Sequence, residues 1–171
     1  MQVETYLLAE HDWVPNNGRL PVILYRRAIA PSSCEETATA FEDAFARHGW
    51  PAQWRDGIYD YHHYHSTAHE VLGIAAGSAR LMIGGPGGRE VEVSAGDALL
   101  LPTGTGHCSL ESSEDFLVVG GYPEGQSWDI CRDAPDPVAR ERMAALPFPA
   151  SDPIAGVGGP LNEHWKAALQ G

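Results

Sequence analysis

Lysine is almost absent from this sequence of 171 residues, and cationic side chains of any kind are few. Eleven lysine and arginine residues face 23 aspartate and glutamate residues, so the formal net charge is −12 at pH 7. Nucleic acids and anionic membrane surfaces select for basic protein surfaces, so we expect no nucleic-acid partner and no membrane partner. The single lysine, Lys166, stands near the end of the sequence, which leaves a Schiff-base mechanism without an evident nucleophile.

Cysteine and long apolar runs are also scarce. The three cysteines, Cys34, Cys108 and Cys131, are scattered and odd in number, which favours free thiols in a reducing compartment over a disulfide framework. No stretch reaches the roughly 18 apolar residues that a membrane-spanning helix needs. The first residues lack the basic and apolar segments of a signal peptide. We therefore expect a cytoplasmic protein.

Histidine is concentrated in residues 57–77, which read GIYDYHHYHSTAHEVLGIAAG. Side chains alternate across a strand, so His63 and His65 are expected on one face, roughly 6–7 Å apart along it. The short polar run after His65 breaks the strand, and a second strand from residue 69 can bring Glu70 back beside the two imidazoles. Two neutral nitrogens and a carboxylate make most of a site for a divalent transition metal.

A second stretch offers a further ligand. The apolar run at residues 98–101 is short and bounded by breakers, which predicts a buried strand. His107 follows the tight turn after this run and can supply a fourth ligand. Its neighbour Cys108 is expected on the opposite face, because alternate side chains of an extended segment point in opposite directions.

At these two stretches the chain resembles the cupin superfamily. The first cupin motif, G-x5-H-x-H-x4-E-x6-G, is met at every position, and the second, G-x5-P-x-G-x2-H-x3-N, is met up to its last position, where Glu111 replaces asparagine. The segments YHHYHS-x-x-HEVLG and LPxGTGH are further similar to a bacterial group of single-domain cupins without an assigned activity. The matching residues are Gly57, His63, His65, Glu70 and Gly77 for the first motif, and Gly96, Pro102, Gly104 and His107 for the second.

The resemblance implies an all-β fold, the double-stranded β-helix or jelly roll of the cupin barrel, with a few peripheral helices. It also implies one divalent transition metal ion as cofactor, of iron, manganese, nickel, cobalt or zinc, and the sequence does not choose among these. The implied ligands are His63, His65, Glu70 and His107.

Two neighbouring histidines leave alternatives open. His69 competes with Glu70 as a ligand, because it stands one residue away at the same turn, although the motif spacing favours Glu70. His62 alternates with His63 and is expected to have a structural role. Residues that share the parity of the ligands are candidates to contact them or to line the pocket, and these are Tyr59, Tyr61 and Ser109.

Aromatic residues are concentrated just before the first motif, at Trp50, Trp54 and Tyr59. For them we favour packing against one end of the barrel over stacking on a substrate. In the loop-like stretch further on, Gln126 and Trp128 are candidates to close the mouth of the pocket.

The length suits a single domain, and we expect one cupin domain over residues 1–171. Short apolar segments between glycine and proline turns predict a barrel core over about 57–122. Strands are predicted near residues 4–8 and over 21–29, 58–65, 69–76, 79–83, 89–94, 97–101, 107–111 and 116–122.

The parts outside the barrel core, residues 1–56 and 123–171, are predicted to be partly helical, with the second part wrapping the surface. Ser33 and Glu36 form a capping-box pattern at the start of the first helix. The predicted helices extend from Cys34 to His48, from about Pro137 to Ala145 and from about Leu161 to Leu169.

Three function classes fit this site. The first is a metal-dependent oxygenase acting on a small polar or aromatic metabolite, because four protein ligands leave two positions of a six-coordinate ion open. The second is an isomerase or lyase that uses the same ligands without O2, and the third is a non-catalytic module that binds a small ligand or a metal. The cupin superfold hosts many functions and does not separate them. We also expect a homodimer paired through sheet edges, because the N-terminal strands have no obvious covering element.

Overall fold

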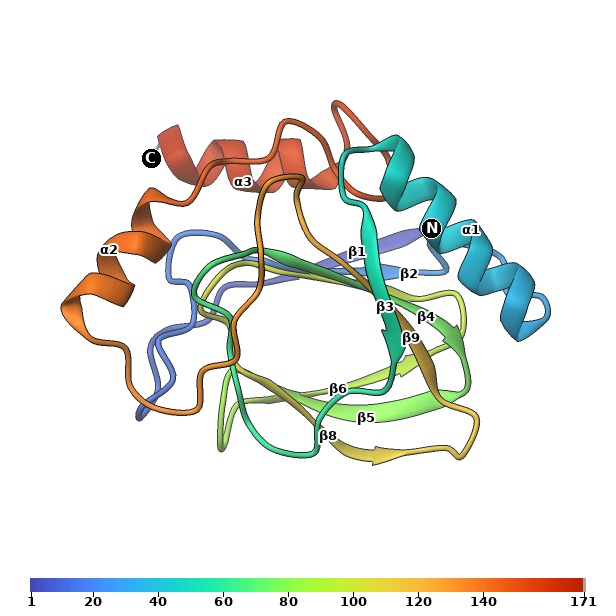
Figure 1. Ribbon diagram of the computed structural model, residues 1–171, viewed down its shortest axis with the longest axis horizontal. Coiled ribbons are helices and arrows are strands. Elements are labelled where there is room, and N and C mark those ends of the chain that lie inside the picture. The colour runs from blue at the N-terminus through green and yellow to red at the C-terminus, as the bar shows by residue number, and fades with distance from the viewer. Residues whose placement is uncertain (171) are drawn as a thin grey trace.

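Two β-sheets lie face to face (Figure 1). Apolar side chains fill the space between them. The computed structural model describes residues 1–170, and the side chains of residues 1–165. The strands are β1 (Gln2–Tyr6), β2 (Val22–Arg26), β3 (Ala52–Asp56), β4 (Glu70–Ala76), β5 (Ser78–Ile83), β6 (Arg89–Ser94), β7 (Ala98–Leu101), β8 (His107–Ser112) and β9 (Leu117–Gly121). Their order is β1-β2-β7-β4-β9-β3 in the larger sheet and β6-β5-β8 in the smaller one. This is the two-sheet arrangement of a cupin barrel, so the predicted all-β fold class is confirmed.

Strand β4 shows how both faces of the larger sheet are buried. Alternate side chains point in opposite directions, so Leu72 and Ile74 enter the space between the sheets while Val71 and Ala75 pack on the outer face. Burial on both faces explains why this strand is apolar almost throughout. Glu70, the first residue of β4, shares the inward parity of Leu72, and this places its carboxylate inside the barrel.

Helix α1 (Cys34–Arg47) covers the outer face of the larger sheet (Figure 1). The hydroxyl of Ser33 accepts a hydrogen bond of 3.2 Å from the amide of Glu36, as the capping pattern predicts. A Cβ atom added to Gly73 would stand 2.6 Å from the ring of Phe41, so the helix packs directly on the backbone of β4. The predicted helix is confirmed and ends one residue earlier than expected.

The other two predicted helices are confirmed as well. Helix α2 (Pro137–Ala145) begins after Asp136, whose carboxylate accepts a hydrogen bond of 2.7 Å from an amide of the first turn. Helix α3 (Pro160–Gln170) buries Leu161 and Trp165 against the outer face of the larger sheet. The side chain of Lys166 lies outside the described part. None of the helices that the structure describes has the length and apolar character needed to cross a membrane.

One predicted strand is wrong. Residues 58–65 have irregular backbone with two isolated bridges, from His63 to His107 and from Tyr64 to Cys131. An isoleucine and several tyrosines give this segment its β character, but its neighbouring residues bond to different partners, so no continuous ladder forms. The segment therefore carries ligand side chains on irregular backbone.

Strand β3, with the sequence AQWRD, was not predicted. It contains no β-branched residue, and its hydrogen bonds to β9 at the edge of the larger sheet define it. The other predicted strands appear as β1, β2 and β4 to β9 with shifted ends.

Candidate metal centre

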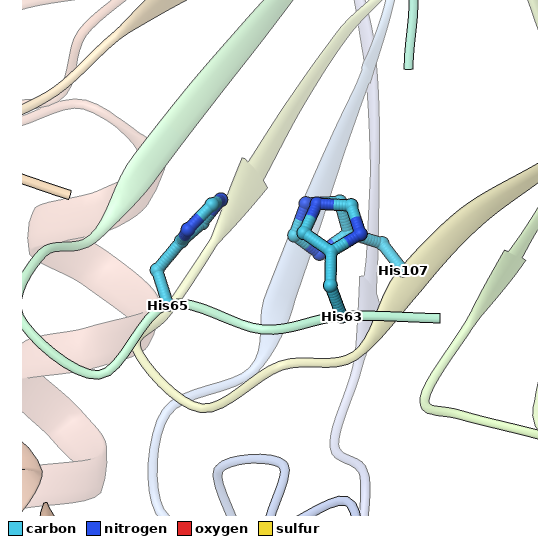
Figure 2. A group of neighbouring side chains, drawn as sticks. All are labelled: His63, His65 and His107. Carbon is cyan, nitrogen blue, oxygen red and sulfur yellow. The ribbon is translucent and has the colours of Figure 1, made fainter. Parts of the chain in front are cut away.

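Three histidines from the two motifs meet inside the barrel (Figure 2). One ring nitrogen from each of His63, His65 and His107 lies within 4.8 Å of the others, and all three residues are buried. His63 and His107 are joined through the backbone, because the amide of each donates to the carbonyl of the other, at 3.3 and 2.9 Å. Their ring centroids are 4.1 Å apart, and the ring of His65 lies beside them.

Two of these imidazoles are oriented by carbonyls of their own segments. Nδ1 of His63 lies 3.1 Å from the carbonyl oxygen of Tyr61, and Nδ1 of His107 lies 3.0 Å from that of Thr105. A carbonyl oxygen only accepts hydrogen bonds, so each Nδ1 carries the proton. In a neutral imidazole the lone pair then belongs to Nε2, the nitrogen that is free to bind a metal.

The third imidazole is oriented from far along the chain. Nδ1 of His65 donates to the carbonyl oxygen of Asp129. Its Nε2 therefore also carries the lone pair when the ring is neutral. That nitrogen is buried and has no hydrogen-bond partner among the described residues.

The carboxylate of Glu70 completes the group. Its Oε2 lies 3.2 Å from Nε2 of His65, and its Oε1 lies 3.2 Å from Nε2 of His107. Lone pairs of a carboxylate and a neutral imidazole repel each other, so a proton or a cation is needed between them. Ligands about 2.1 Å from a common ion lie roughly 3 Å apart, which agrees with these separations. The residues present therefore fit a divalent transition ion.

The electrostatics of the group also favour a cation. Burial alone would lower the pKa of His65 and raise that of Glu70, but the attraction between the two groups outweighs it. The pKa of His65 is therefore raised, and the pKa of Glu70 lies well below its usual range. Burial and the neighbouring ring of His107 lower the pKa of His63 to about 3. A neutral His63 and an ionised Glu70 are the forms that bind metals.

Glu70 is held in turn by two aromatic residues. The hydroxyl of Tyr122, just after β9, donates to Oε2 of Glu70 at 2.6 Å and accepts a hydrogen bond of 2.8 Å from the indole nitrogen of Trp54. Burial and the charge of Glu70 raise the pKa of Tyr122, so its hydroxyl stays protonated and remains a donor. This chain of hydrogen bonds fixes the orientation of the carboxylate.

His69 is not part of the group. It precedes the inward-facing Glu70, so its side chain points to the opposite face of the sheet. There its ring centroid lies 4.9 Å from that of Trp165. Its Nδ1 accepts a hydrogen bond of 2.9 Å from the amide of Thr103, and burial lowers its pKa to about 3. His69 therefore neither replaces Glu70 beside the three imidazoles nor lines their cavity, and its ring caps a backbone amide instead.

Two further candidates also lie away from the cluster. Gln126 accepts a hydrogen bond of 3.0 Å from the amide of His69 and donates one of 3.1 Å to the carbonyl of Pro147, so it joins loops behind the site. Ser109 donates its amide to the carbonyl of Tyr59 at 2.9 Å, and its side chain is not among the residues that line the cavity described below.

The tyrosines and His62 differ in position. The ring of Tyr59 stacks on that of Tyr61 with centroids 4.7 Å apart, and both rings meet His63 edge-on. Tyr59 lines the cavity, whereas Tyr61 is not among its lining residues. Nε2 of His62 lies 3.7 Å from the sulfur of Cys108, away from the cluster, as its alternation with His63 predicts.

A cavity of about 320 Å³ opens over the cluster. Trp54 forms part of its wall, and a Cβ atom added to Gly120 on the neighbouring strand would stand 2.1 Å from its indole ring. Trp54 thus both packs on the sheet and faces the cavity, where we expected packing alone. The lining residues beyond the cluster and Glu70 are Trp54, Asp56, Gly57, Ile58, Tyr59, Leu72, Tyr122, Trp128 and Ile130.

The sequence interpretation missed several of these residues. Leu72 has the same strand parity as Glu70, so alternation along β4 was a signal that could have found it. Tyr122 and Asp129 gave no such signal, because their contacts to Glu70 and His65 join parts of the chain that are far apart in sequence.

The chain is similar over nearly its whole length to a known bacterial protein. The chain is 37% identical over 168 residues to the Bacillus subtilis (strain 168) protein YjlB, described as an uncharacterized protein, and this covers 96% of the chain and 97% of the relative. No protein-family model matches the chain.

Similar solved structures are more distant. An acireductone dioxygenase from Bacillus anthracis, with a cadmium ion in its active centre, has 19% identity and a TM-score of 0.43 over 63% of this chain and 73% of its own. Procruciferin, an 11S globulin from Brassica napus, has 17% identity and a TM-score of 0.37 over 66% of this chain, which spans only 22% of the globulin. Likeness at this level carries no inference about the chemistry of the site.

Proposed function

The chain belongs to the family of Bacillus subtilis YjlB, and for it we propose the function of a metal-dependent oxygenase that acts on a small metabolite. One observation carries this proposal: three imidazoles with the Nε2 lone pair and one carboxylate converge at the floor of an apolar cavity. The motif-level resemblance to single-domain bacterial cupins supports the same ligand set.

The residues that would hold the ion are His63, His65, Glu70 and His107. Three neutral imidazoles and one carboxylate leave a divalent ion with a net positive charge and two open positions in six-coordination. When bound, a redox-capable ion of this kind supplies Lewis acidity and the activation of O2. Iron, manganese, nickel and cobalt fit these requirements, whereas zinc fits the ligands without the redox chemistry.

The protein's own residues position and shield the reacting groups. The carbonyls of Tyr61, Thr105 and Asp129 bind Nδ1–H of the three imidazoles, so that each neutral ring presents its Nε2 lone pair to the ion. Tyr122 holds the carboxylate of Glu70 through a hydrogen bond of 2.6 Å. The apolar walls limit the water that reaches the ligands, which strengthens electrostatic interactions inside the cavity.

The test begins with metal content. Protein purified without added metal should contain about one transition ion per chain by elemental analysis. Protein loaded anaerobically with Fe(II) is then mixed with O2 and with small chelating compounds, namely diols, thiols and β-diketones, while an electrode follows oxygen. Uptake that needs both the metal and the compound, and that is lost in His107→Ala but kept in His62→Ala, is the expected result.

The other function classes appear as different results of the same screen. Turnover without O2 would replace the oxygenase by an isomerase or lyase. Tight binding without turnover under either condition would replace it by a non-catalytic binding module. In each case the metal content is measured first, so loss of the ion is not mistaken for loss of chemistry.

We further propose that the chain forms a homodimer and that it is cytoplasmic. The support for the dimer is that β1 is an edge strand of the larger sheet, and an exposed edge offers unpaired backbone groups to a second copy. A monomeric mass by light scattering at micromolar concentration would count against the dimer.

A further inference from the structure

The described residues that line the cavity over the metal centre provide no cationic wall. None of its described lining residues is an arginine or a lysine, and the two carboxylates that line it are Asp56 and Glu70. An anionic group on a ligand would lose its hydration on entering the cavity and would find no opposite charge on the wall. Its transfer from water is therefore unfavourable. The negative net charge of the chain adds long-range repulsion.

A cation near this wall, Arg132, is already engaged. The guanidinium carbon of Arg132 lies 3.9 Å from the ring centroid of Tyr61. A planar ring has two faces, and Tyr59 stacks on one face of Tyr61 with centroids 4.7 Å apart, so Arg132 occupies the other. Because Tyr59 lines the cavity and Tyr61 does not, Arg132 lies behind the tyrosine pair and not on the wall.

Large apolar side chains are exposed where the cavity opens. Tyr59, Trp128 and Ile130 are 51%, 41% and 44% exposed, and all three line the cavity. The ring of Trp128 stacks on that of Tyr122 with an interplanar angle of 6° and centroids 4.7 Å apart. Exposed apolar groups gathered around a cavity indicate that a ligand covers them.

We propose that the ligand of this cavity is an uncharged planar aromatic compound with two adjacent hydroxyl groups, and that Trp128 determines specificity for its ring. This inference rests on the proposed metal site, because the hydroxyl pair is what binds the two open positions of the ion. The ring then lies among Trp54, Tyr59 and Trp128, where offset stacking and edge contacts stabilise it. A cavity of about 320 Å³ is at the small end of ligand sites, which suits a compound with one ring.

The experiment measures binding to protein loaded with Zn(II), which prevents redox turnover. Three probes are titrated at pH 7 by calorimetry: catechol, 3,4-dihydroxybenzoate and acetylacetone. The first two share the hydroxyl pair and the ring and differ by one carboxylate, whereas acetylacetone chelates without an aromatic ring. Catechol should bind at least about tenfold more tightly than 3,4-dihydroxybenzoate, because the added carboxylate finds no partner on the wall.

A variant tests the role of the indole. Trp128→Ala should weaken catechol binding about tenfold and leave acetylacetone binding within about twofold, because only the aromatic ring contacts Trp128. The matched control is Phe148→Ala, which removes a partly exposed aromatic side chain outside this cavity and should change neither affinity. Zinc content is measured in each variant, so that a change in the metal site is recognised.

The outcomes separate this inference from the oxygenase. Equal or tighter binding of 3,4-dihydroxybenzoate, or catechol binding unchanged in Trp128→Ala, would overturn the ligand class while the metal-loaded protein still binds acetylacetone. Failure of the wild-type protein to retain zinc would overturn the metal site itself. The expected preference for catechol, with no oxygen uptake by the Fe(II) protein, would overturn the oxygenase and support the ligand class.

Discussion

His63 and His107 are oriented by carbonyls two residues earlier in the chain, whereas His65 is oriented by the carbonyl of Asp129, 64 residues later. The first two contacts form wherever their own turns form. The third exists only when the 126–133 segment docks on the barrel. The orientation of two ligands is therefore determined by local structure, whereas the orientation of the third depends on tertiary packing.

The 126–133 segment is fastened by side-chain and backbone contacts. The carboxylate of Asp129 accepts hydrogen bonds from the amide and the hydroxyl of Ser66, at 2.6 and 2.5 Å. Tyr64 and Cys131 exchange two backbone hydrogen bonds, of 3.0 and 2.9 Å. The same segment places Trp128 and Ile130 in the cavity wall, so the orientation of His65 and the shape of the wall depend on one docking event.

The largest expected effect comes from removing the distantly held ligand. His65→Ala should lose the bound ion, because the remaining ligands no longer enclose it. His62→Ala, which changes the neighbouring histidine that faces Cys108, should keep the ion. Elemental analysis of both variants provides the measurement, and full metal occupancy in His65→Ala would contradict the assignment.

Replacing the carboxylate ligand should have the next largest effect. Glu70→Gln removes the negative charge between His65 and His107, and should weaken metal binding beyond the 10–100-fold range typical of groups that only support a ligand. His69→Gln should leave metal affinity nearly unchanged and lower the melting temperature, because the amide of Thr103 loses its imidazole acceptor. Competition with a chelator gives the affinities, and the reverse order would make His69 the ligand.

Asp129→Ala tests whether the orientation of His65 depends on the docking of the 126–133 segment. Loss of its carboxylate frees the 126–133 segment from Ser66, which should misorient His65 and weaken metal binding by about 10–100-fold. The matched control is Asp133→Ala, which removes a nearby exposed carboxylate and the same charge. Chelator competition and tryptophan fluorescence should change together in the first variant. Equal affinities in both variants would show that His65 does not depend on docking.

The smallest expected effect concerns the hydrogen bond between Tyr25 and Asp152, and this effect depends on pH. The hydroxyl of Tyr25 donates to Asp152 at 2.5 Å, and burial together with that charge raises the pKa of Tyr25 well above its usual value. The folded state therefore favours the protonated phenol, so its contribution is complete below pH of about 10 and declines as pH rises further. Tyr25→Phe should cost about 1–3 kcal/mol at pH 7, and the difference from wild type should shrink above pH 10.

Urea unfolding at pH 8 and pH 10.5 provides the measurement for this variant. Tyr59→Phe, which changes an exposed tyrosine, is the control and should follow the wild type at both pH values. A difference that grows with pH would contradict the sign of the effect.

The sequence predicted those parts of the fold that depend on local pattern. Ser33 and Glu36 marked the start of α1, and apolar runs marked the strands at the centre of the larger sheet. Motif spacing identified His63 and His107 as candidate ligands, and the contacts that orient their rings are also local.

The remainder depends on contacts between distant segments. Strand β3 exists because β9 offers an edge, and Asp129 orients His65 because the 126–133 segment docks, and neither fact is visible in local composition. Residues 58–65 show the opposite error, since β propensity is high there but partners for a ladder are missing.

Trp54 and Gly120, which face each other across β3 and β9, have an evolutionary consequence. The indole occupies the space where any larger residue at position 120 would place its Cβ, only 2.1 Å from the ring. Among homologous sequences, the two positions should therefore vary as a pair, with tryptophan at one accompanied by glycine at the other. A lineage that exchanges the pair for a small residue at 54 and a side chain at 120 would inherit a differently shaped cavity over the same ligands, and with it a route to new substrates.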